Sequence, residues 1–207
     1  MDDPVNQHLG RRDVQDDILT GIAQKRWDIV ITETPCSSLC IVIDPPIRSH
    51  AELNGKAASM RGSWGAYLDR HNALIDFTAK VCRACHAVRI PWLVENPSTR
   101  SKGVAFWPAK ADRVTLWDMP AITALCDDVP TARTTFPQCA FGSPFQKYTT
   151  LLGSANMASA FDAHLPSTAC TCRTHAEVAV GQRAARAAAY PRAMCQAIAD
   201  AIEACMP

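Results

Sequence analysis

The sequence predicts an α/β domain built on a parallel sheet. Two short apolar runs, residues 27–32 and 91–95, are each typical of a buried strand, and a long amphipathic segment separates them. The order strand, helix, strand is that of a βαβ unit, whose strands lie parallel in one sheet. With 207 residues, 48% of them hydrophobic and 20% charged, the chain has the size and composition of one globular domain.

The chain is expected to open with a helix followed by a strand and a long loop. Apolar residues recur at every fourth position from residue 14, which predicts a helix over residues 14–25 with Asp13 as its N-cap. The strand over 27–32 stops before Pro35, which cannot donate to a ladder. Residues 37–65 are rich in proline, glycine and polar side chains, so they should form a long loop of functional interest.

The rest of the chain predicts two more helices and three more strands. Apolar residues repeat every three or four positions over 66–88, forming one continuous helical stripe that leads into the strand 91–95. Further strands are expected over 134–136 and 148–152. A final helix should begin near Pro191, since proline suits the first helical turn.

Composition bears on the compartment of the protein, the state of its cysteines and its binding partners. No apolar run is long enough to span a bilayer, and the acidic start is unlike a secretory signal, so we expect an intracellular protein. The ten cysteines are then expected to be core filler for the most part rather than disulfides. The net charge of +1 does not indicate any class of binding partner, although residues 98–113 and 170–192 are locally basic. Such segments fit a nucleic-acid contact and fit solvated loops equally well.

A thiol and a carboxylate follow the two predicted parallel strands. Cys36 comes after the first strand, and Glu95 ends the second. Ligands of parallel α/β sheets bind beyond the carboxyl ends of the strands. The sequence therefore predicts that Cys36 and Glu95 face one crevice.

These motifs resemble those of cytosine-5 DNA methyltransferases. Thr-Pro-Cys-Ser-Ser at 34–38 is similar to the family's nucleophile motif, and Glu-Asn-Pro at 95–97 to its acidic motif. Residues 141–147 resemble a further family segment, and Asp13 matches the acidic residue that meets the adenine of S-adenosylmethionine. The resemblance covers residues 11–154 and is closest to the compact versions found in phages and mobile elements.

The resemblance implies a Rossmann-like three-layer α/β/α domain of methyltransferase type, truncated at its amino-terminal edge. Residues 1–207 would form one domain, with a family-like core at 11–154 and a C-terminal extension at 155–207 that ends in a helix. The glycine-rich loop and the ribose-binding acid of the family are absent. We therefore expect a degenerate enzyme or one part of a split enzyme. A second chain would then supply the cofactor-binding half, and S-adenosylmethionine would bind this chain alone weakly or not at all.

The resemblance also implies roles for individual residues. Cys36 would add to carbon 6 of a flipped cytosine, and Glu95 would hold the base while charge develops in the ring. Asp13 would bind the cofactor, and DNA would be contacted by Ser38, Gln146 and Lys147.

Each residue also has a plain structural interpretation. Asp13 would serve as a helix cap only, Cys36 as a small residue packed at a strand end, and Lys147 as an ordinary exposed lysine. Glu95 would be paired with Arg100 or Lys102.

Two other functions stay open. A methyltransferase relic without catalysis would serve as a nucleic-acid or protein interaction module. A cysteine-nucleophile hydrolase would need a histidine partner, for which the candidates are His50, His71 and His86.

Two groups of cysteine and histidine raise the question of metal. Cys82, Cys85 and His86 share a helix face and are expected to pack in the core, whereas Cys170, Cys172 and His175 lie in a predicted turn. The second group is one ligand short of a tetrahedral site. No complete zinc site within one chain is expected, and a fourth ligand would have to come from Cys82, Cys85, His86 or His164.

Overall fold

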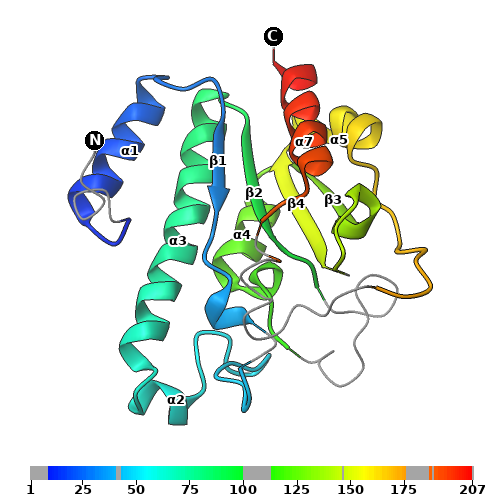
Figure 1. Ribbon diagram of the computed structural model, residues 1–207. Helices are drawn as coiled ribbons and strands as arrows, with labels where there is room; N and C mark the ends of the chain where they lie inside the picture. The colour runs from blue at the N-terminus through cyan, green and yellow to red at the C-terminus, as the bar shows by residue number, and fades with distance from the viewer. Residues whose placement is uncertain are drawn as a thin grey trace, which may run out of the picture.

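The protein, seen in a computed structural model, has a four-stranded mixed sheet with helices on both faces (Figure 1). The structure describes residues 9–40, 43–99, 113–145, 147–175, 187 and 189–206. In this part of the chain no helix is long and apolar enough to cross a membrane. The main elements are α1 (Arg12–Ala23), β1 (Val30–Glu33), α2 (Ala57–Arg61), α3 (Gly65–Val88), β2 (Trp92–Pro97), α4 (Pro120–Asp128), β3 (Thr131–Pro137), β4 (Tyr148–Ser154), α5 (Ala158–His164) and α7 (Arg192–Cys205).

The strands lie in the order β1-β2-β4-β3. β1 and β2 are parallel neighbours joined through α3, which confirms the predicted βαβ arrangement. β4 runs antiparallel to both β2 and β3. The sheet is therefore mixed, and the sequence did not predict the antiparallel strand, because periodicity does not choose a strand's partner.

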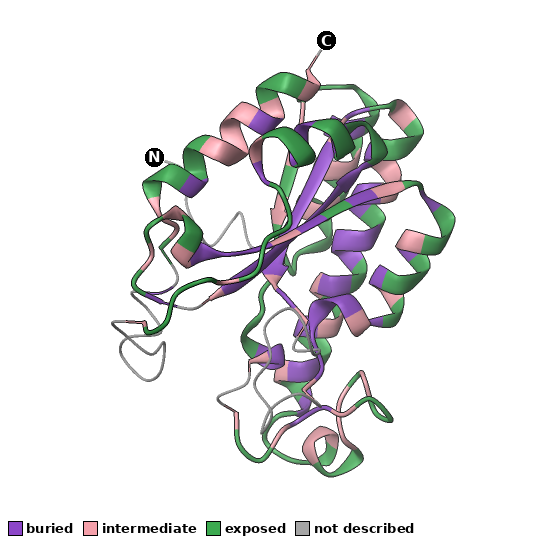
Figure 2. Cartoon of the chain, turned by 90° about the vertical axis from the view of Figure 1, so that its right-hand side faces the viewer, coloured by how far each residue is buried: buried purple, intermediate pink, exposed green. Residues whose placement is uncertain are grey.

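One face of the sheet is covered by α1, α3 and α4. The core on this side is continuous from the helices to the inward side chains of the sheet, and it includes Ile22, Ile75, Cys82, Trp92, Val94, Leu125 and Leu152. The other face is covered by α5 and α7, whose core includes Leu93, Phe136, Leu151, Phe161, Met194 and Ala201. Because helices cover both faces of the sheet, β2 and β4 are buried along almost their whole length, polar residues included, and Figure 2 shows the central strands as buried.

The C-terminal part of the chain belongs to this fold. α7 packs against α5 and buries Met194 and Ala201 against the sheet. Gly153 in β4 lets α5 lie close to the sheet, because a Cβ there would stand 2.9 Å from the Met157 sulfur and 3.2 Å from the Phe161 ring. α5 and α7 thus form the second helical layer of the same domain.

Several local predictions were wrong. α1 begins at Arg12 with Arg11 as its N-cap, so Asp13 lies in the first turn and is not the cap. α4 and α5 were not predicted. The sequence does carry one signal for α4, since Pro120 occupies the first helical position.

The expectation that most of the ten cysteines fill the core was also wrong. Only Cys82 and Cys85 are buried, and both lie on the core-facing side of α3 as predicted. The other eight are half-buried or exposed. Their positions at the surface leave room for chemistry that a core cysteine lacks.

Candidate active site

Cys36 and Glu95 lie at the same end of two adjacent parallel strands. Glu33 at the end of β1 is in register with Glu95 in β2, and three residues later the chain reaches Cys36 at the start of a short 3₁₀ helix (Ser37–Leu39). Cys36 also lines a cavity of about 40 Å³ together with Asn96 and Pro97. The carboxylate of Glu95 is close enough to act electrostatically on the thiol.

The β2 strand and α3 hold the backbone just before Cys36. The buried side-chain amide of Asn96 donates to the Thr34 carbonyl at 2.7 Å. The Thr34 hydroxyl is 2.8 Å from the hydroxyl of Thr78 on α3. Asn96 therefore connects the end of β2 to the turn that presents Cys36, which gives the asparagine after Glu95 a structural reason.

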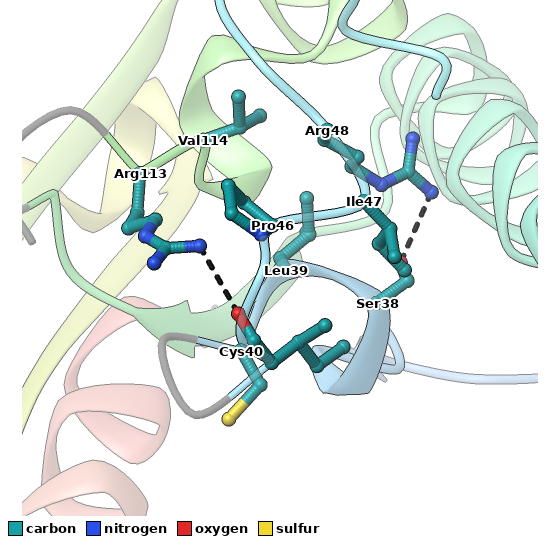
Figure 3. Close-up of a pocket in the computed structure, with 9 residues that line it drawn as sticks. Ser38, Leu39, Cys40, Pro46, Ile47, Arg48, Arg113 and Val114 are labelled. Atoms are coloured by element: carbon teal, nitrogen blue, oxygen red, sulfur yellow. Dashed lines mark hydrogen bonds between the residues drawn. The ribbon is translucent and has the colours of Figure 1, made fainter. Parts of the chain in front are cut away.

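Three more side chains fix the residues on either side of Cys36. Tyr67 on α3 donates to the Ser37 hydroxyl at 2.8 Å, and His71 forms a hydrogen bond with the Pro35 backbone. Arg48 donates to the buried Ser38 hydroxyl at 3.0 Å, as Figure 3 shows. With so many bonds to its neighbours, Cys36 is held in place before any substrate arrives.

The Cys36 side chain is open to solvent, but the protein around its sulfur is dense enough to change its ionisation. Burial raises the pKa of the Cys36 thiol, and nearby Cys40 and Glu95 raise it further, whereas the positive charge of Lys147 lowers it. The thiol is thus protonated more readily than an isolated cysteine. Lys147 is the group that favours the reactive thiolate.

Glu95 is a buried acid, with 7% of its surface exposed. Burial raises the pKa of Glu95, against hydrogen bonds from Tyr190 and Thr149 and the charge of Lys147, which lower it. Within the described structure its Oε1 atom has no hydrogen-bond partner. A buried carboxyl with an unused oxygen is suited to hold a polar ligand atom.

A short series of hydrogen-bonded polar groups fixes the position of the Glu95 carboxyl group. The amide of fully buried Gln138 donates to the Thr149 hydroxyl at 2.9 Å, which leaves the Thr149 hydrogen for Glu95. Lys147 donates to the Ala187 carbonyl at 3.3 Å and lies 5.5 Å from the Tyr190 ring centroid. The turn after β3, strand β4 and the C-terminal segment therefore all contribute to the surroundings of one carboxyl group.

Sequence reasoning missed this supporting group. Gln138, Thr149 and Tyr190 carry no motif and lie far from Glu95 along the chain. Only the position of Thr149, next to the segment 141–147, gave a signal that could have been followed. Tyr190 comes from the region beyond residue 154 that the family resemblance does not cover.

The other predicted site residues fall in different places. Lys147 is half-buried and faces Cys36 and Glu95, so it is not an ordinary exposed lysine. Ser38 is buried and bonded to Arg48, so its described contact is internal. Asp13 is exposed and paired with Arg11 at 2.5 Å, which lowers the pKa of Asp13. Gln146 lies outside the described residues.

The basic segments predicted from sequence lie largely outside the described residues. Arg100 and Lys102, the rival partners of Glu95, are among the residues that the structure does not describe, as are residues 176–186. The described hydrogen bonds of Glu95 come from neutral hydroxyl groups.

No histidine is placed as a base for Cys36 among the described residues. His71 bonds to the Pro35 backbone and stacks 4.2 Å from the Tyr67 ring, and the groups that influence the Cys36 thiol include no histidine. His86 lies at the opposite end of α3, where it lines a different pocket. The arrangement gives no support to a cysteine hydrolase.

A second pocket beside the loop is a packing gap. Arg48 and Arg113 flank it, and Arg113 donates to the Ile43 carbonyl at 3.0 Å (Figure 3). Its volume of about 10 Å³ is at the limit for one water molecule. Burial lowers the pKa of Arg48 to about 10, and its hydrogen bonds go to neutral oxygens of the loop and α3.

The described residues do not fit S-adenosylmethionine. Asp13 is exposed and already paired, and no described glycine stands in a strand-to-helix turn beside it. Such a cofactor needs backbone N–H groups at a helix start and an acid for its ribose. We therefore assign no step to the cofactor within this chain.

Comparison with known proteins gives no match. No family model, no curated protein and no solved structure is significantly similar to this chain. The site therefore has to be interpreted from its own chemistry. It presents a solvent-facing thiol, a buried acid and one nearby lysine, which together can add a sulfur to an electrophilic ring and hold that ring by hydrogen bonds.

Proposed function

We propose that this domain is the base-binding part of a cytosine-5 DNA methyltransferase-like enzyme, with a Rossmann-like sheet. The proposal rests on one observation: Cys36 and Glu95 stand at the carboxyl ends of adjacent parallel strands, the first facing solvent and the second buried with an unused oxygen. The antiparallel strand β4 lies inside the sheet, between β2 and β3, and mixed sheets are common among large α/β folds.

The raised pKa of Glu95 suits this role. A protonated carboxyl donates its hydrogen to ring nitrogen N3 and accepts one from the exocyclic amine of cytosine. Protonation at N3 makes carbon 6 electrophilic, and the Cys36 thiolate adds there. Carbon 5 then carries enamine electrons and can take a proton from water. Loss of the original carbon-5 hydrogen to water, return of the N3 proton to Glu95 and elimination of Cys36 as a thiolate restore the aromatic ring.

The base must leave its duplex to reach Cys36. The described cavity beside Cys36, of about 40 Å³, has room for a water molecule or two, so the ring would have to lie outside it. Lys147, whose charge acts on the Cys36 thiol, would supply positive charge for a phosphate or for the base.

We propose that the methyl donor is held by protein that pairs with the outer edge of β1. Among the described strands β1 pairs only with β2, and its Ile31 is 49% exposed. A groove of about 190 Å³ runs beside this edge, lined by Ile18 of α1, by Leu74 and Phe77 of α3 and by β1 itself. An exposed apolar edge strand is a template for another strand, supplied by a second chain or by a segment outside this sequence.

Hydrogen exchange at carbon 5 tests the catalytic proposal without a methyl donor. Duplex and single-stranded DNA are incubated with the protein in deuterated water, and deuterium in cytosine is measured by mass spectrometry. Exchange should occur with wild-type protein and with Cys195→Ser, which changes an exposed thiol on α7, and should be lost in Cys36→Ser. Equal exchange in wild type and Cys36→Ser would remove Cys36 from the reaction.

The edge proposal has its own test. Ile31→Lys should abolish co-purification with a chain encoded beside this one, because a charge would face the incoming strand. Trp64→Lys is the matched control, since Trp64 is also an exposed large apolar residue but lies at the start of α3. If both variants retain the partner equally, β1 is not the docking edge.

One observation favours a non-catalytic relic instead. The pKa of the Cys36 thiol is raised, so little thiolate is present near neutral pH in the unbound protein. A relic that binds DNA or protein would show no exchange, and Cys36→Ser would leave its binding unchanged. A DNA-binding titration of both proteins separates the two functions.

A further inference from the structure

The turn after β3 and the segment that follows α5 bring three thiols and an imidazole together. The ligand atoms of Cys139, Cys170, Cys172 and His175 all lie within 4.8 Å of one another. Cys139 belongs to the 3₁₀ helix that follows β3 (Gln138–Phe141), and the other three residues come from the irregular segment after α5. None of the four belongs to the apolar cores, so packing does not explain why they gather.

We propose that these four residues bind a structural zinc ion. In a tetrahedron with Zn–S bonds of about 2.3 Å, two sulfurs lie about 3.8 Å apart and a sulfur and an imidazole nitrogen about 3.5 Å apart. The Cys139 and Cys170 sulfurs are 3.5 Å apart, and the Cys170 sulfur is 3.2 Å from His175 Nε2. Because all four ligand atoms lie within 4.8 Å of one another, shifts of up to about 1 Å would bring them to tetrahedral distances around one metal ion.

The chemistry of the ligand set selects zinc. Three thiolates and one imidazole in a tetrahedron form one of the standard closed zinc sites, and oxygen-preferring cations such as Mg²⁺ or Ca²⁺ disfavour such ligands. Each cysteine gives its proton to solvent as it binds. With four protein ligands no position stays open for a substrate, so the site is structural rather than catalytic.

This proposal runs against the expectation from sequence that the chain holds no complete zinc site, and it differs in the residue that supplies the fourth ligand. Cys139 lies 31 positions before Cys170, outside the local group of cysteine and histidine residues in the sequence. Of the four positions expected to provide the missing ligand, Cys82 and Cys85 belong to α3 and are buried on the opposite face of the sheet. The turn after β3 places Cys139 there instead.

The metal would fasten the C-terminal segment to the sheet. Besides the four ligands, this segment is held by the Thr168 amide on the Thr135 carbonyl at 3.1 Å and by the Cys170 amide on the Tyr148 hydroxyl at 2.7 Å. Cys139 is next to Gln138, which supports Glu95 through Thr149. Zinc would therefore stabilise one wall of the candidate site, although the metal proposal does not depend on what that site does.

Metal analysis of the full chain tests the proposal. Protein purified in reductant without chelator should hold about one zinc per chain. Cys139→Ser and Cys172→Ser should lose it, whereas Cys195→Ser and Cys126→Ser, which change an exposed thiol on α7 and a half-buried thiol on α4, should retain it. A folded wild-type protein that stays metal-free after incubation with Zn²⁺ would overturn the proposal.

Cobalt keeps the test decisive if the serine variants do not fold. Co²⁺ added to metal-depleted wild-type protein should give the strong visible bands of a tetrahedral site and a thiolate charge-transfer band. His175→Cys should preserve a tetrahedral spectrum with a fourth sulfur, and His175→Ala should weaken metal affinity at least tenfold. An octahedral spectrum, or unchanged metal affinity in His175→Ala, would each refute the assigned site.

Discussion

At the scale of single residues, the Cys36 thiol is subject to opposing influences. Burial raises its pKa, and Lys147 lowers it. We predict that Lys147→Gln raises the pKa further and slows alkylation of Cys36 by iodoacetamide several-fold at pH 7.5, because less thiolate is present. Mass spectrometry of Cys36 across a pH series measures the shift.

Two controls make this prediction specific. Cys195 on α7 is an exposed thiol in the same molecule, and its alkylation rate should be the same in both proteins. Lys80→Gln, which changes an exposed lysine on α3, should leave the Cys36 profile unchanged. A Cys36 profile that does not move in Lys147→Gln would mean that the lysine does not act on the thiol.

Glu95 should make the stability of the protein depend on pH. Its folded pKa is raised above the ordinary value of 4.5, so the folded state keeps a proton that the unfolded state releases. The resulting stabilisation is complete below that ordinary value and is lost as pH rises through the folded pKa. Glu95→Gln removes this dependence, so its advantage in free energy of unfolding over wild type should grow from pH 4 to pH 8.

Urea unfolding at several pH values measures this difference. Glu203→Gln, which changes an exposed carboxylate near the end of α7, is the matched control and should track wild type. Glu95→Gln should also abolish hydrogen exchange at cytosine carbon 5 if the proposed reaction is correct. A constant difference between Glu95→Gln and wild type at every pH would show that Glu95 does not titrate in this range.

At the scale of elements, the turn after β1 depends on a bond from β2. Asn96→Ala removes the buried donor to the Thr34 carbonyl and should lower the free energy of unfolding by about 1–3 kcal/mol. Tyr67→Phe removes the more exposed bond to Ser37 and should cost about 1 kcal/mol or less. Denaturant melts of both variants give the comparison, and an equal cost would mean that the turn does not rely on Asn96.

The elements also show what sequence can and cannot predict. β1, α3 and β2 were found because their apolar patterns are long or sharply bounded, and the parallel pairing followed from their order. α4 and α5 were missed because each spans only two or three turns. The insertion of β4 between β2 and β3 depends on tertiary packing, which no local pattern encodes.

The candidate site divides in the same way. Cys36 and Glu95 follow strands, so strand order alone predicts that they share a crevice. Tyr190 contacts Glu95, and Gln138 supports it through Thr149, although both lie far from Glu95 in the sequence. Only the folding of β3, β4 and the C-terminal segment brings them close. Cys139 could not be predicted as a ligand for the same reason, because Cys170, Cys172 and His175 are near it in space but not in sequence.

At the scale of the whole molecule, the C-terminal region completes both the core and the candidate site. α5 and α7 cover the face of the sheet that α1, α3 and α4 leave open (Figure 1). The same region carries Tyr190 to Glu95 and Ala187 to Lys147. A domain that ended at residue 154 would expose one face of β2 and β4 and would leave the Glu95 carboxyl without its tyrosine.

Met194 on α7 tests this dependence directly. Its side chain is fully buried against the core that contains Phe136 and Leu151, so Met194→Ala should lower the free energy of unfolding by about 2–5 kcal/mol. Cys195→Ala, one position further on the exposed side of the same helix, should change it by no more than about 0.5 kcal/mol. Thermal and urea melts should show a single transition in both variants, because the two helical layers share one sheet. A separate early transition in Met194→Ala, or a cost no greater than that of Cys195→Ala, would show that α7 is an appendage. In that case the support that Tyr190 gives to Glu95 would have to come from a weakly held segment.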